Sequence, residues 1–254
     1  MPLLEVRAIS KNFGGVSALK EMSLEVHPAE IVGLIGPNGA GKTSFFNCVT
    51  GLMRADGGDI FFREQKVRLN KLSPNRILEA GVARTFQNLR IFRNMSVLEN
   101  VAIGFHTRTR SGLWDALLRT RRHRVEERMI FSRGLELLRF VGLETQANEI
   151  AGNLPYGSQK RLEIARALAT DPKLLLLDEP VAGMNPAEKE DVIRLIRKIR
   201  ERGIAVLIIE HDMKVVMPLS ERLVVMDEGA KIAEGRPEEV RANPRVIQAY
   251  LGEG

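Results

Sequence analysis

Residues 36–44 read Gly36-Pro37-Asn38-Gly39-Ala40-Gly41-Lys42-Thr43-Ser44, in which two glycines separated by four residues precede a lysine and a threonine. This spacing fits a phosphate-binding loop. Glycine lets the backbone take positive φ and approach phosphates closely, so that successive N–H groups form an anion nest. The helix that begins near Gly41 adds the positive end of its dipole. Lys42 places a full charge at the β and γ phosphate oxygens, and the Thr43 hydroxyl can ligate Mg²⁺.

The residues on both sides of this loop have the pattern that a phosphate site requires. Glu30–Ile35 is an apolar run typical of a buried strand that leads into the loop. Ser44–Leu52 is predicted to be the following helix, because apolar residues recur at helical spacing, at Phe45, Cys48, Val49 and Leu52. Strand, loop and helix in this order favour a phosphate site over a plain glycine-rich turn.

A second stretch, Leu174-Leu175-Leu176-Leu177-Asp178-Glu179-Pro180, is an apolar run that ends in two carboxylates. Such a run is typical of a strand buried in a parallel sheet. Asp178 is predicted to hold Mg²⁺, and Glu179 is predicted to orient and deprotonate an attacking water. An Asp-Glu pair alone would indicate only a solvated strand end, but the phosphate loop upstream favours a catalytic pair. Together the two stretches predict a site for a nucleoside triphosphate, magnesium and water.

Two more polar residues are candidates for the same site. His211 follows Ile204–Glu210, the next apolar strand, and the strand ends of a parallel sheet line a ligand crevice. A histidine there can reach a γ-phosphate, although taken alone it more often serves a cap or a turn. Gln87 carries a neutral amide that could contact magnesium or water, and by itself it gives no signal.

Composition and charge narrow the class of protein. Of the 254 residues, 44% are hydrophobic and 28% charged, which is ordinary for a globular protein in water. No run approaches about eighteen uncharged apolar residues, so we expect no membrane span. The first residues lack the basic and apolar regions of a signal peptide. The single cysteine, Cys48, excludes an internal disulfide, fits a reducing compartment and is predicted to be a core residue.

The net charge of +6 suits an anionic partner without specifying one. Much of the excess lies between Thr107 and Arg128, at Arg108, Arg110, Arg119, Arg121, Arg122, Arg124 and Arg128. Nucleic acid is disfavoured as the partner, because Trp114 is the only aromatic residue in this segment. A surface near anionic lipid and a plain solvated helix face stay open as interpretations.

The order of predicted elements indicates an α/β fold. Strands are expected first, at Leu3–Ile9, Ala18–Val26 (across the Gly14-Gly15 turn) and Ile60–Phe62 (after a turn at Asp56–Asp59). Helical patterns dominate from Pro74 to Ala169, and strands then alternate with helices up to a hairpin of Arg222–Met226 and Lys231–Ala233. We therefore expect a mostly parallel sheet with flanking helices, an N-terminal antiparallel β subdomain and an inserted α-helical subdomain.

The helix expected after residue 185 carries start and stop signals. Asn185 is a cap, Pro186 suits the first position, and Glu188 completes a capping pattern. Gly203 is expected to end it. Its buried stripe is predicted at Val192, Ile193, Ile196 and Ile199.

With these parts in this order, the chain resembles the ATP-binding cassette family of ATPases along nearly its whole length. Gly36–Ser44 matches the family's phosphate loop, Gln87 its glutamine loop and Leu154-Pro155-Tyr156-Gly157-Ser158-Gln159 its signature loop. Further along the chain, Leu174–Glu179 matches the second phosphate motif, Ala182–Asn185 the D-loop and His211 the switch histidine. Phe13 occupies the place of the aromatic ring that stacks on adenine in this family.

This resemblance implies a single P-loop NTPase domain over 1–254, with a catalytic core of 1–87 and 170–254 and a helical insertion of 88–169. It implies ATP and Mg²⁺ as cofactors, with Lys42, Glu179 and His211 in catalysis and Thr43, Gln87 and Asp178 at the metal. Two copies would clamp each ATP, with Leu154–Gln159 of one chain acting in trans on the phosphate loop of the other. The resemblance further implies that the two copies close on ATP only while its γ-phosphate is present, and that hydrolysis lets them open again.

The resemblance also implies partners and a location. They are two transmembrane permeases, a second cassette chain in a heterodimer or a homodimer, and indirectly an extracytoplasmic solute-binding protein, with no nucleic acid. The location would be cytoplasmic, peripheral on the inner face of the plasma membrane. Four stretches are more closely similar to bacterial importers of branched-chain amino acids, at Phe13–Gly15, Gly81–Gln87, Ile209–Met213 and Asn243–Gly252. Importers of urea and short amides look similar.

The chain departs from the family pattern at two motifs. In the signature loop, Pro155, Tyr156 and Ser158 replace the usual serine, glycine and glutamine, and Pro155 lacks the hydroxyl and N–H that would donate to a γ-phosphate. Pro155 is instead predicted to be the first residue of a helix through Ala169. Asn185 replaces the usual D-loop aspartate. A weaker ATP site at this signature loop, and hence two unequal sites, is the hypothesis that follows.

Two other functions compete with an importer subunit. A cassette ATPase acting on nucleic acid or ribosomes would usually carry two cassettes or a long coiled coil, and neither pattern is present in this sequence. A small kinase would need an acceptor pocket and would leave the signature loop unexplained.

Overall fold

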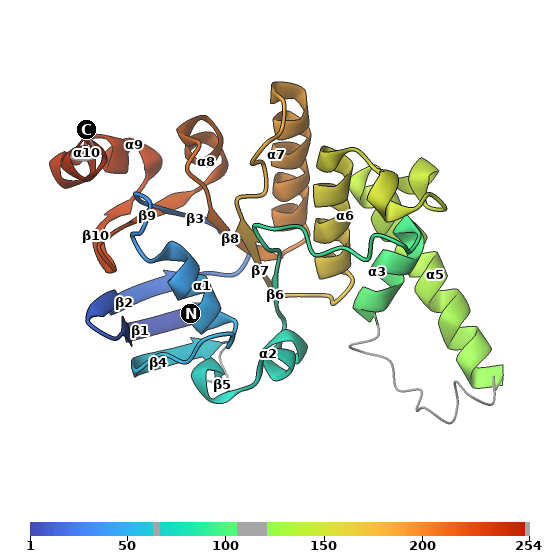
Figure 1. Ribbon diagram of the computed structural model, residues 1–254, viewed down its shortest axis with the longest axis horizontal. Coiled ribbons are helices and arrows are strands. Elements are labelled where there is room, and N and C mark those ends of the chain that lie inside the picture. Colours follow the sequence, from blue (N-terminus) through green and yellow to red (C-terminus); the bar gives the residue numbers. More distant parts are fainter. Residues whose placement is uncertain (63–66, 106–120, 252–254) are drawn as a thin grey trace.

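Two sheets lie one above the other in the left half of Figure 1, which shows a computed structural model whose described residues are 1–62, 67–105 and 121–251. The upper sheet has the strand order β10-β9-β3-β8-β7-β6. Neighbours from β9 to β6 run parallel, and β10 is antiparallel to β9. The strands are β3 Ile31–Ile35, β6 Val82–Arg84, β7 Leu174–Asp178, β8 Ala205–Ile209, β9 Arg222–Asp227 and β10 Ala230–Gly235.

The central strands of this sheet are apolar because both of their faces are covered. Every residue of β3, β7 and β8 is buried. Since parallel strands end at one edge of a sheet, the segments after β3, β6, β7 and β8 all leave from the same edge. These segments contain the phosphate loop, Gln87, Glu179 and His211, and the fold therefore gathers residues that are far apart in the sequence.

The lower sheet is antiparallel, with the strand order β2-β1-β4-β5. Its strands are β1 Leu4–Phe13, β2 Val16–Val26, β4 Gly57–Phe62 and β5 Val67–Arg68. Helix α1, Lys42–Val49, packs between the two sheets, with Phe45, Phe46, Cys48 and Val49 buried in a cluster that includes residues of both. The antiparallel N-terminal subdomain and the α/β class that the sequence predicts are confirmed.

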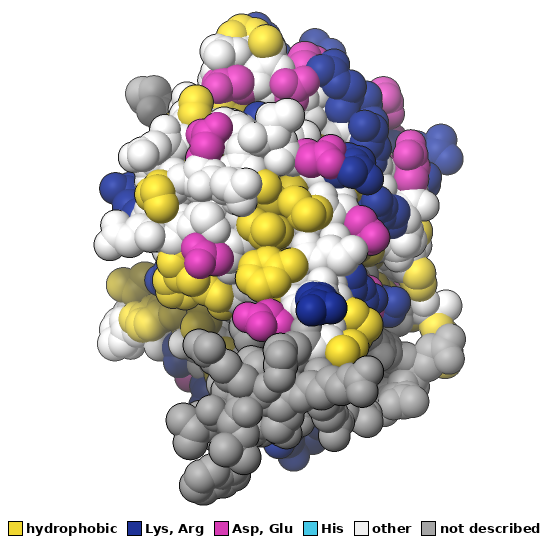
Figure 2. Space-filling model, turned by 90° about the vertical axis from the view of Figure 1, so that its right-hand side faces the viewer, with side chains coloured by type: hydrophobic (Ala, Val, Ile, Leu, Met, Phe, Trp, Pro, Cys, Tyr) yellow, Lys and Arg dark blue, Asp and Glu magenta, His cyan; other side chains and the backbone are white. Residues whose placement is uncertain are grey.

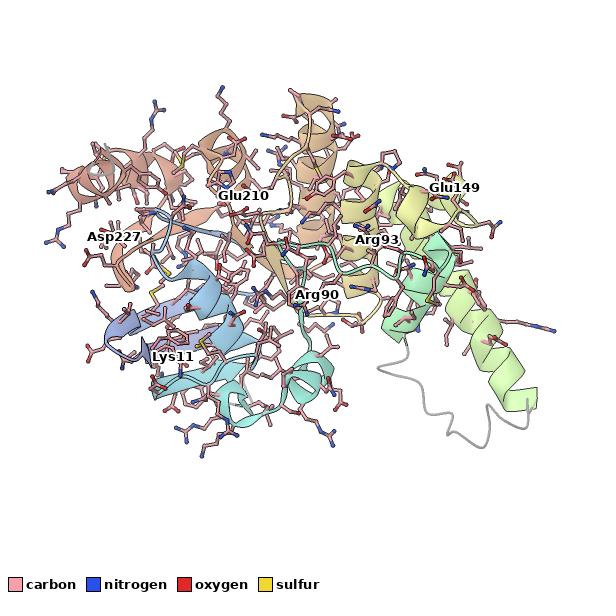
Figure 3. The ribbon with its side chains drawn as sticks, in the orientation of Figure 1. Lys11, Arg90, Arg93, Glu149, Glu210 and Asp227 are labelled. Atoms are coloured by element: carbon pink, nitrogen blue, oxygen red, sulfur yellow. The ribbon has the colours of Figure 1, made fainter. Side chains whose placement is uncertain are left out.

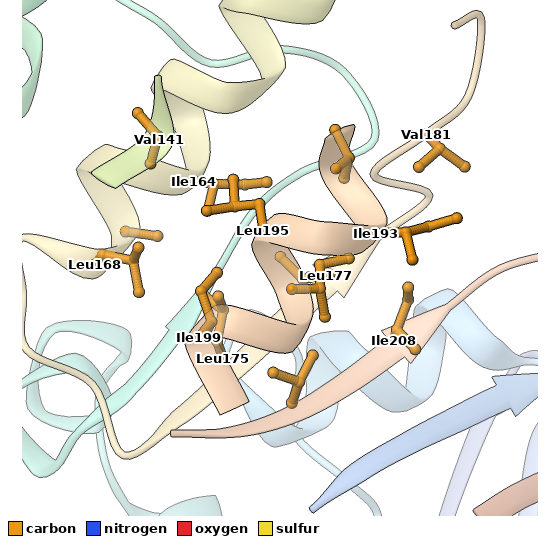
Figure 4. Close-up of a cluster of buried hydrophobic side chains, with 14 of the residues drawn as sticks. Val141, Ile164, Leu168, Leu175, Leu177, Val181, Ile193, Leu195, Ile199 and Ile208 are labelled. Carbon is orange, nitrogen blue, oxygen red and sulfur yellow. The ribbon is translucent and has the colours of Figure 1, made fainter. Parts of the chain in front are cut away.

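Of the other helices, the one at Pro74–Ala80 lies on the same side of the central sheet as α1, with Ile77 buried in the same cluster, and the rest cover the opposite face and the right side of Figure 1. These helices are α2 Pro74–Ala80, α3 Val97–Phe105, α5 Arg121–Val141, α6 Tyr156–Leu168, α7 Pro186–Glu201, α8 Met213–Leu219, α9 Pro237–Arg241 and α10 Pro244–Leu251, with 3-10 turns at Leu69–Lys71, Glu144–Gln146 and Ala151–Asn153. Helices α3, α5 and α6 pack on one another. Figure 4 shows the cluster in which Ile193 and Ile199 of α7 meet Leu175 and Leu177 of β7, with Ile164 of α6 beside them.

Helix α7 follows its sequence signals closely. The Asn185 side chain accepts a hydrogen bond from the Glu188 N–H, and the Glu188 carboxylate accepts one from the Asn185 N–H, each at 3.0 Å. Gly203 takes φ 82° just after the helix ends. No helix within the described residues is both long and apolar enough to cross a bilayer.

Three local predictions were wrong. Asp56–Asp59 is not a turn, because β4 begins at Gly57 and pairs with β1 across a register shift. A Cβ at Gly58 would lie 2.4 Å from the carbonyl oxygens of Arg7 and Ala8, so the glycine serves a close backbone approach within the sheet. Helix α1 ends at Val49, which leaves Leu52 about half exposed rather than on the buried face. Strand β6 lies where helical patterns were expected, since three residues are too few to show a period.

The predicted core position of Cys48 is confirmed, since it is 1% exposed. Burial raises the pKa of its thiol to about 11. At pH 8 we expect the native chain to react with iodoacetamide at least about a hundred-fold more slowly than the chain unfolded in guanidinium, because the thiolate is the reacting form. The rate is measured by mass spectrometry on the single thiol. Equal rates in the two states would show that Cys48 is accessible in the folded chain.

Candidate functional site

A cavity of about 800 Å³ opens where the edge of the central sheet meets strand β2. The phosphate loop lines one side of it, and Gln87 and Glu179 line another. The lining residues are Gly15, Val16, Ser17, Ala18, Lys20, Asn38, Gly39, Ala40, Gly41, Lys42, Thr43, Ser44, Gln87, Glu179, Ile209 and Glu228. Phe13, Gly36, Pro37, Asp178 and His211 are described residues outside this lining, although Phe13 is half exposed at the end of β1, near Gly15 and Val16.

The phosphate loop needs glycine where its backbone passes close to other backbone. Gly36 has φ 151°, and a Cβ there would lie 2.1 Å from the Met226 carbonyl oxygen. Gly41 has φ 95° as the cap of α1, and its Cβ would lie 2.4 Å from the Ala18 carbonyl oxygen. Any side chain at either position would therefore displace the loop from the strands that support it. The loop is thus positioned by close packing on β2 and β9.

Lys42 is the first residue of α1, and its side chain folds back over the loop. Its Nζ donates to the carbonyl oxygens of Gly36 at 2.5 Å and Pro37 at 2.7 Å. These bonds place an ammonium group beside the N–H groups of the loop. A full positive charge and oriented N–H dipoles in one concavity make it suited to an anion.

Asp178 ends β7 and is 3% exposed. Its Oδ2 accepts a hydrogen bond from the Arg84 guanidinium at 2.8 Å. Arg84 also donates to Asn47 Oδ1 at 2.7 Å, and it lies 5.2 Å from the ring centres of Phe46 and Phe86. Arg84 therefore holds the Asp178 carboxylate from one side and links it to α1.

Glu179 takes φ 48°, a left-handed conformation that is uncommon for a residue other than glycine. Its N–H bonds to the Ile209 carbonyl oxygen at 3.0 Å, which ties the turn after β7 to β8. The carboxylate accepts a hydrogen bond from Gln87 Nε2 at 3.2 Å and lies 3.6 Å from His211 Nδ1. Three residues that the sequence singled out separately are therefore in contact, and strained backbone of this kind is common at functional sites.

Glu210 supports the site, and the sequence did not reveal this role. It is 1% exposed between β8 and His211 (Figure 3). Its carboxylate accepts hydrogen bonds from the N–H groups of Val181 and His211, both at 3.3 Å. Burial raises the pKa of Glu210, and these backbone donors partly offset the effect. Glu210 thus joins the segment after β7 to the one after β8 and supports the position of His211.

The predicted signature loop lies at the start of α6. Pro155 is the cap, with ψ 151°, so the helix begins at Tyr156 and the prediction that Pro155 is its first residue was wrong by one position. Gln159 Nε2 donates to the Leu154 carbonyl oxygen at 2.8 Å, and Ser158 is buried. Tyr156 is 44% exposed. None of the described residues Leu154–Gln159 lines the cavity of their own chain.

The residues named for magnesium have suitable chemistry. Thr43 and Gln87 line the cavity, and Asp178, which is outside the lining, directly precedes Glu179 at the end of β7. Hydroxyl, amide and carboxylate oxygens are ligands that Mg²⁺ prefers, with phosphate oxygens and waters completing the shell. The described residues hold no cluster of three or more His, Cys, Asp or Glu side chains able to bind a metal by themselves.

Comparison with known proteins identifies the family. The model of the family described as ABC transporter matches residues 19–182. The chain belongs to the ABC transporter family. A second model, described as branched-chain amino acid ATP-binding cassette transporter, matches residues 230–254 of this cassette.

Several relatives of the cassette match it over nearly their full length. The high-affinity branched-chain amino acid transport ATP-binding protein LivG of Escherichia coli K12 is 46% identical over 99% of this chain and 98% of its own. Its counterpart BraF of Pseudomonas aeruginosa is 44% identical over the same shares. A solved ATP-binding cassette in its ADP conformation superposes with a TM-score of 0.84 at 33% identity, covering 99% of each chain.

These findings confirm the predicted family, the P-loop α/β fold and the predicted ATPase class. They do not favour an ATPase acting on nucleic acid or ribosomes. The roles of individual site residues, magnesium and the division at residues 88 and 169 stay predictions. Residues 106–120, which hold much of the arginine-rich segment, lie outside the described residues.

Proposed function

We propose that the chain is the ATP-hydrolysing subunit of an importer of branched-chain, or related hydrophobic, amino acids. The observation that carries this proposal is the match of residues 230–254 to the branched-chain cassette model. Relatives named for the transport of these amino acids, 44–47% identical over 99% of the chain, support it further. Urea and short amides are the alternative cargo.

The contacts at the cavity support a division of roles. Lys42 and the N–H groups of Gly36–Ser44 hold the phosphates of ATP, and Phe13 stacks on its adenine. Thr43, Gln87 and Asp178 hold Mg²⁺, which neutralises phosphate charge when bound. The Glu179 carboxylate, held by Gln87 at 3.2 Å, takes a proton from the attacking water, and His211 donates toward the γ-phosphate. The residues of 1–87 and 170–254 form this catalytic core.

A second cassette chain completes the site in our proposal. Leu154–Gln159 of one chain would face the phosphate loop of the other, in a heterodimer or a homodimer. Two features support a weak site at this signature loop. Pro155 has no donor, and the Asn185 side chain is engaged in capping α7.

In a heterodimer, two unequal ATP sites are therefore expected. Replacing the Glu179 equivalent in each chain of a heterodimer, one at a time, should reduce total hydrolysis by different amounts. Phosphate release from the two single variants measures this. Equal losses would show that both sites hydrolyse equally.

The insertion of residues 88–169 is proposed to meet a transmembrane permease, of which the transporter contains two. A groove of about 510 Å³ lies between β6 and helices α3 and α6, and its lining includes Ile91, Phe92 and Ile103. Phe92 is 47% exposed. Hydrophobic side chains also gather near the middle of the helical end of the molecule (Figure 2). An apolar hollow with an exposed aromatic ring suits a helix from a partner chain.

This assembly would place the cassette on the cytoplasmic face of the plasma membrane, with a solute-binding protein on the opposite side. To test it, the tagged chain is purified from membranes with its partners and reconstituted into vesicles containing ATP. We expect two permease chains to copurify and leucine, isoleucine or valine to be taken up. Uptake of urea but not leucine would overturn the proposed cargo, and the absence of any permease would overturn the importer.

A further inference from the structure

Two buried charged residues on α6 have no part in the proposed chemistry. Lys160 is 3% exposed and Glu163 is 2% exposed, and they lie one turn apart on the helix that begins just after Pro155. Lysine and glutamate are almost never fully buried unless they have partners. Burial raises the pKa of Glu163 and lowers the pKa of Lys160. Their contacts must therefore offset the free-energy cost of burying two charged groups.

Both side chains form hydrogen bonds with the backbone of the same short segment, Phe86 and Gln87. Glu163 Oε1 accepts a hydrogen bond from the Phe86 N–H at 3.2 Å. Lys160 Nζ donates to the Gln87 carbonyl oxygen at 3.0 Å and to the Phe86 carbonyl oxygen at 3.3 Å. An acceptor and a donor from one helix thus hold the segment by both its N–H and its carbonyl groups.

The same segment carries a side chain that touches the proposed base. Gln87 Nε2 donates to Glu179 Oε2 at 3.2 Å. A continuous set of hydrogen bonds therefore runs from α6 through the backbone at residues 86 and 87 to the Glu179 carboxylate. Apolar residues at positions 160 and 163 would avoid the cost of burying charge, but they would remove all three backbone bonds.

We propose that Glu163 and Lys160 are positioning residues, which hold Gln87 against Glu179 and make its position depend on the helix that carries the signature loop. The inference rests on the proposed roles of Gln87 and Glu179. It deepens them, because it names the residues through which a displacement of α6 would move a side chain at the hydrolytic carboxylate.

The test uses the assembled transporter with substitutions at position 163. Glu163→Leu removes the acceptor, whereas Glu163→Gln keeps a carbonyl oxygen for the Phe86 N–H. We expect Glu163→Leu to lower kcat for ATP hydrolysis about tenfold or more, since small misplacements of catalytic groups have large effects, while KM for ATP stays within about twofold. Glu163→Gln should restore most of kcat. Lys160→Met should resemble Glu163→Leu.

A double-mutant cycle separates this role from a purely structural one. In a Gln87→Ala background, Glu163→Leu should have little further effect on kcat, because the side chain that it positions is gone. Hydrogen exchange of the amides at residues 86 and 87 should be faster in Glu163→Leu than in the parent chain. Additive losses of kcat, or unchanged exchange at these amides, would overturn the inference.

A matched control is Glu30→Leu. The Glu30 carboxylate also accepts a backbone hydrogen bond, from the His27 N–H at 2.8 Å, and pairs with Arg222, but it lies at the opposite end of β3 from the phosphate loop. This variant should leave kcat and the exchange at residues 86 and 87 unchanged, and a loss equal to that of Glu163→Leu would count against the inference. If Gln87→Ala alone hydrolyses ATP at the parent rate, the inference is wrong, whereas leucine uptake would still support the importer.

Discussion

Replacing Glu179 by glutamine is expected to lower the rate of ATP hydrolysis about 10²–10⁴-fold while ATP binding is retained. Glutamine has nearly the same shape as glutamate and keeps a carbonyl oxygen for the bond from Gln87, but it cannot take a proton from water. The Glu179 carboxylate lines the cavity and is only 22% exposed, so a solvent base does not readily replace it. The variant should accumulate in the ATP-bound closed form, because hydrolysis is the step that opens it.

The measurements are phosphate release, ATP binding by calorimetry and the fraction of dimer in the presence of ATP. Glu228→Gln is the matched control, since its carboxylate lines the same cavity but is 83% exposed and pairs with Lys20 at 3.5 Å. It should hydrolyse ATP at nearly the parent rate. If Glu179→Gln also does so, then another group accepts the proton and the assignment of Glu179 is wrong.

The elements that could be predicted are those whose signals are local. Asn185, Pro186 and Glu188 predict the start of α7 because a capping box is complete within four residues. The strands β7 and β8 could be predicted because burial on both faces requires continuous apolar runs. Strand β6 could not be predicted, because its three residues are too few to show a period. The position of Gly58 could not be predicted either, because a glycine is equally typical of a turn and of an irregularity within a strand pair.

The parts of the site that could not be predicted depend on contacts between distant residues. Arg84 and Asp178 are 94 positions apart, and only the parallel pairing of β6 with β7 brings them together. An arginine at the end of a strand gives no sign of whether it points to water or to a carboxylate. Glu163 and Glu210 have the same ambiguity, because burial of a carboxylate depends on the backbone N–H groups around it. The phosphate loop, in contrast, could be predicted, because its function depends on the backbone of one continuous stretch of sequence.

Replacing Lys42 by alanine is expected to weaken ATP binding about ten- to hundred-fold or more, because one charge-assisted hydrogen bond contributes about 1.5–3 kcal/mol. The lysine Nζ bonds to the carbonyl oxygens of Gly36 and Pro37, within the concavity formed by the loop. Alanine would remove the charge and both bonds, so that these carbonyl dipoles would face a phosphate without a compensating cation. Hydrolysis should then fall in parallel with binding, in contrast to Glu179→Gln, which affects hydrolysis alone.

Lys42→Arg provides the matched control, since it keeps the charge but changes its shape and reach. We expect it to bind ATP better than Lys42→Ala and less well than the parent chain, with thermal unfolding in the absence of nucleotide similar for all three. Calorimetry with ATP measures the affinities. The two substitutions together separate the charge of the ammonium from its position over the loop. Parent-like affinity in Lys42→Ala would mean that the N–H groups of residues 36–44 hold the triphosphate without the lysine, and the site as assigned would be wrong.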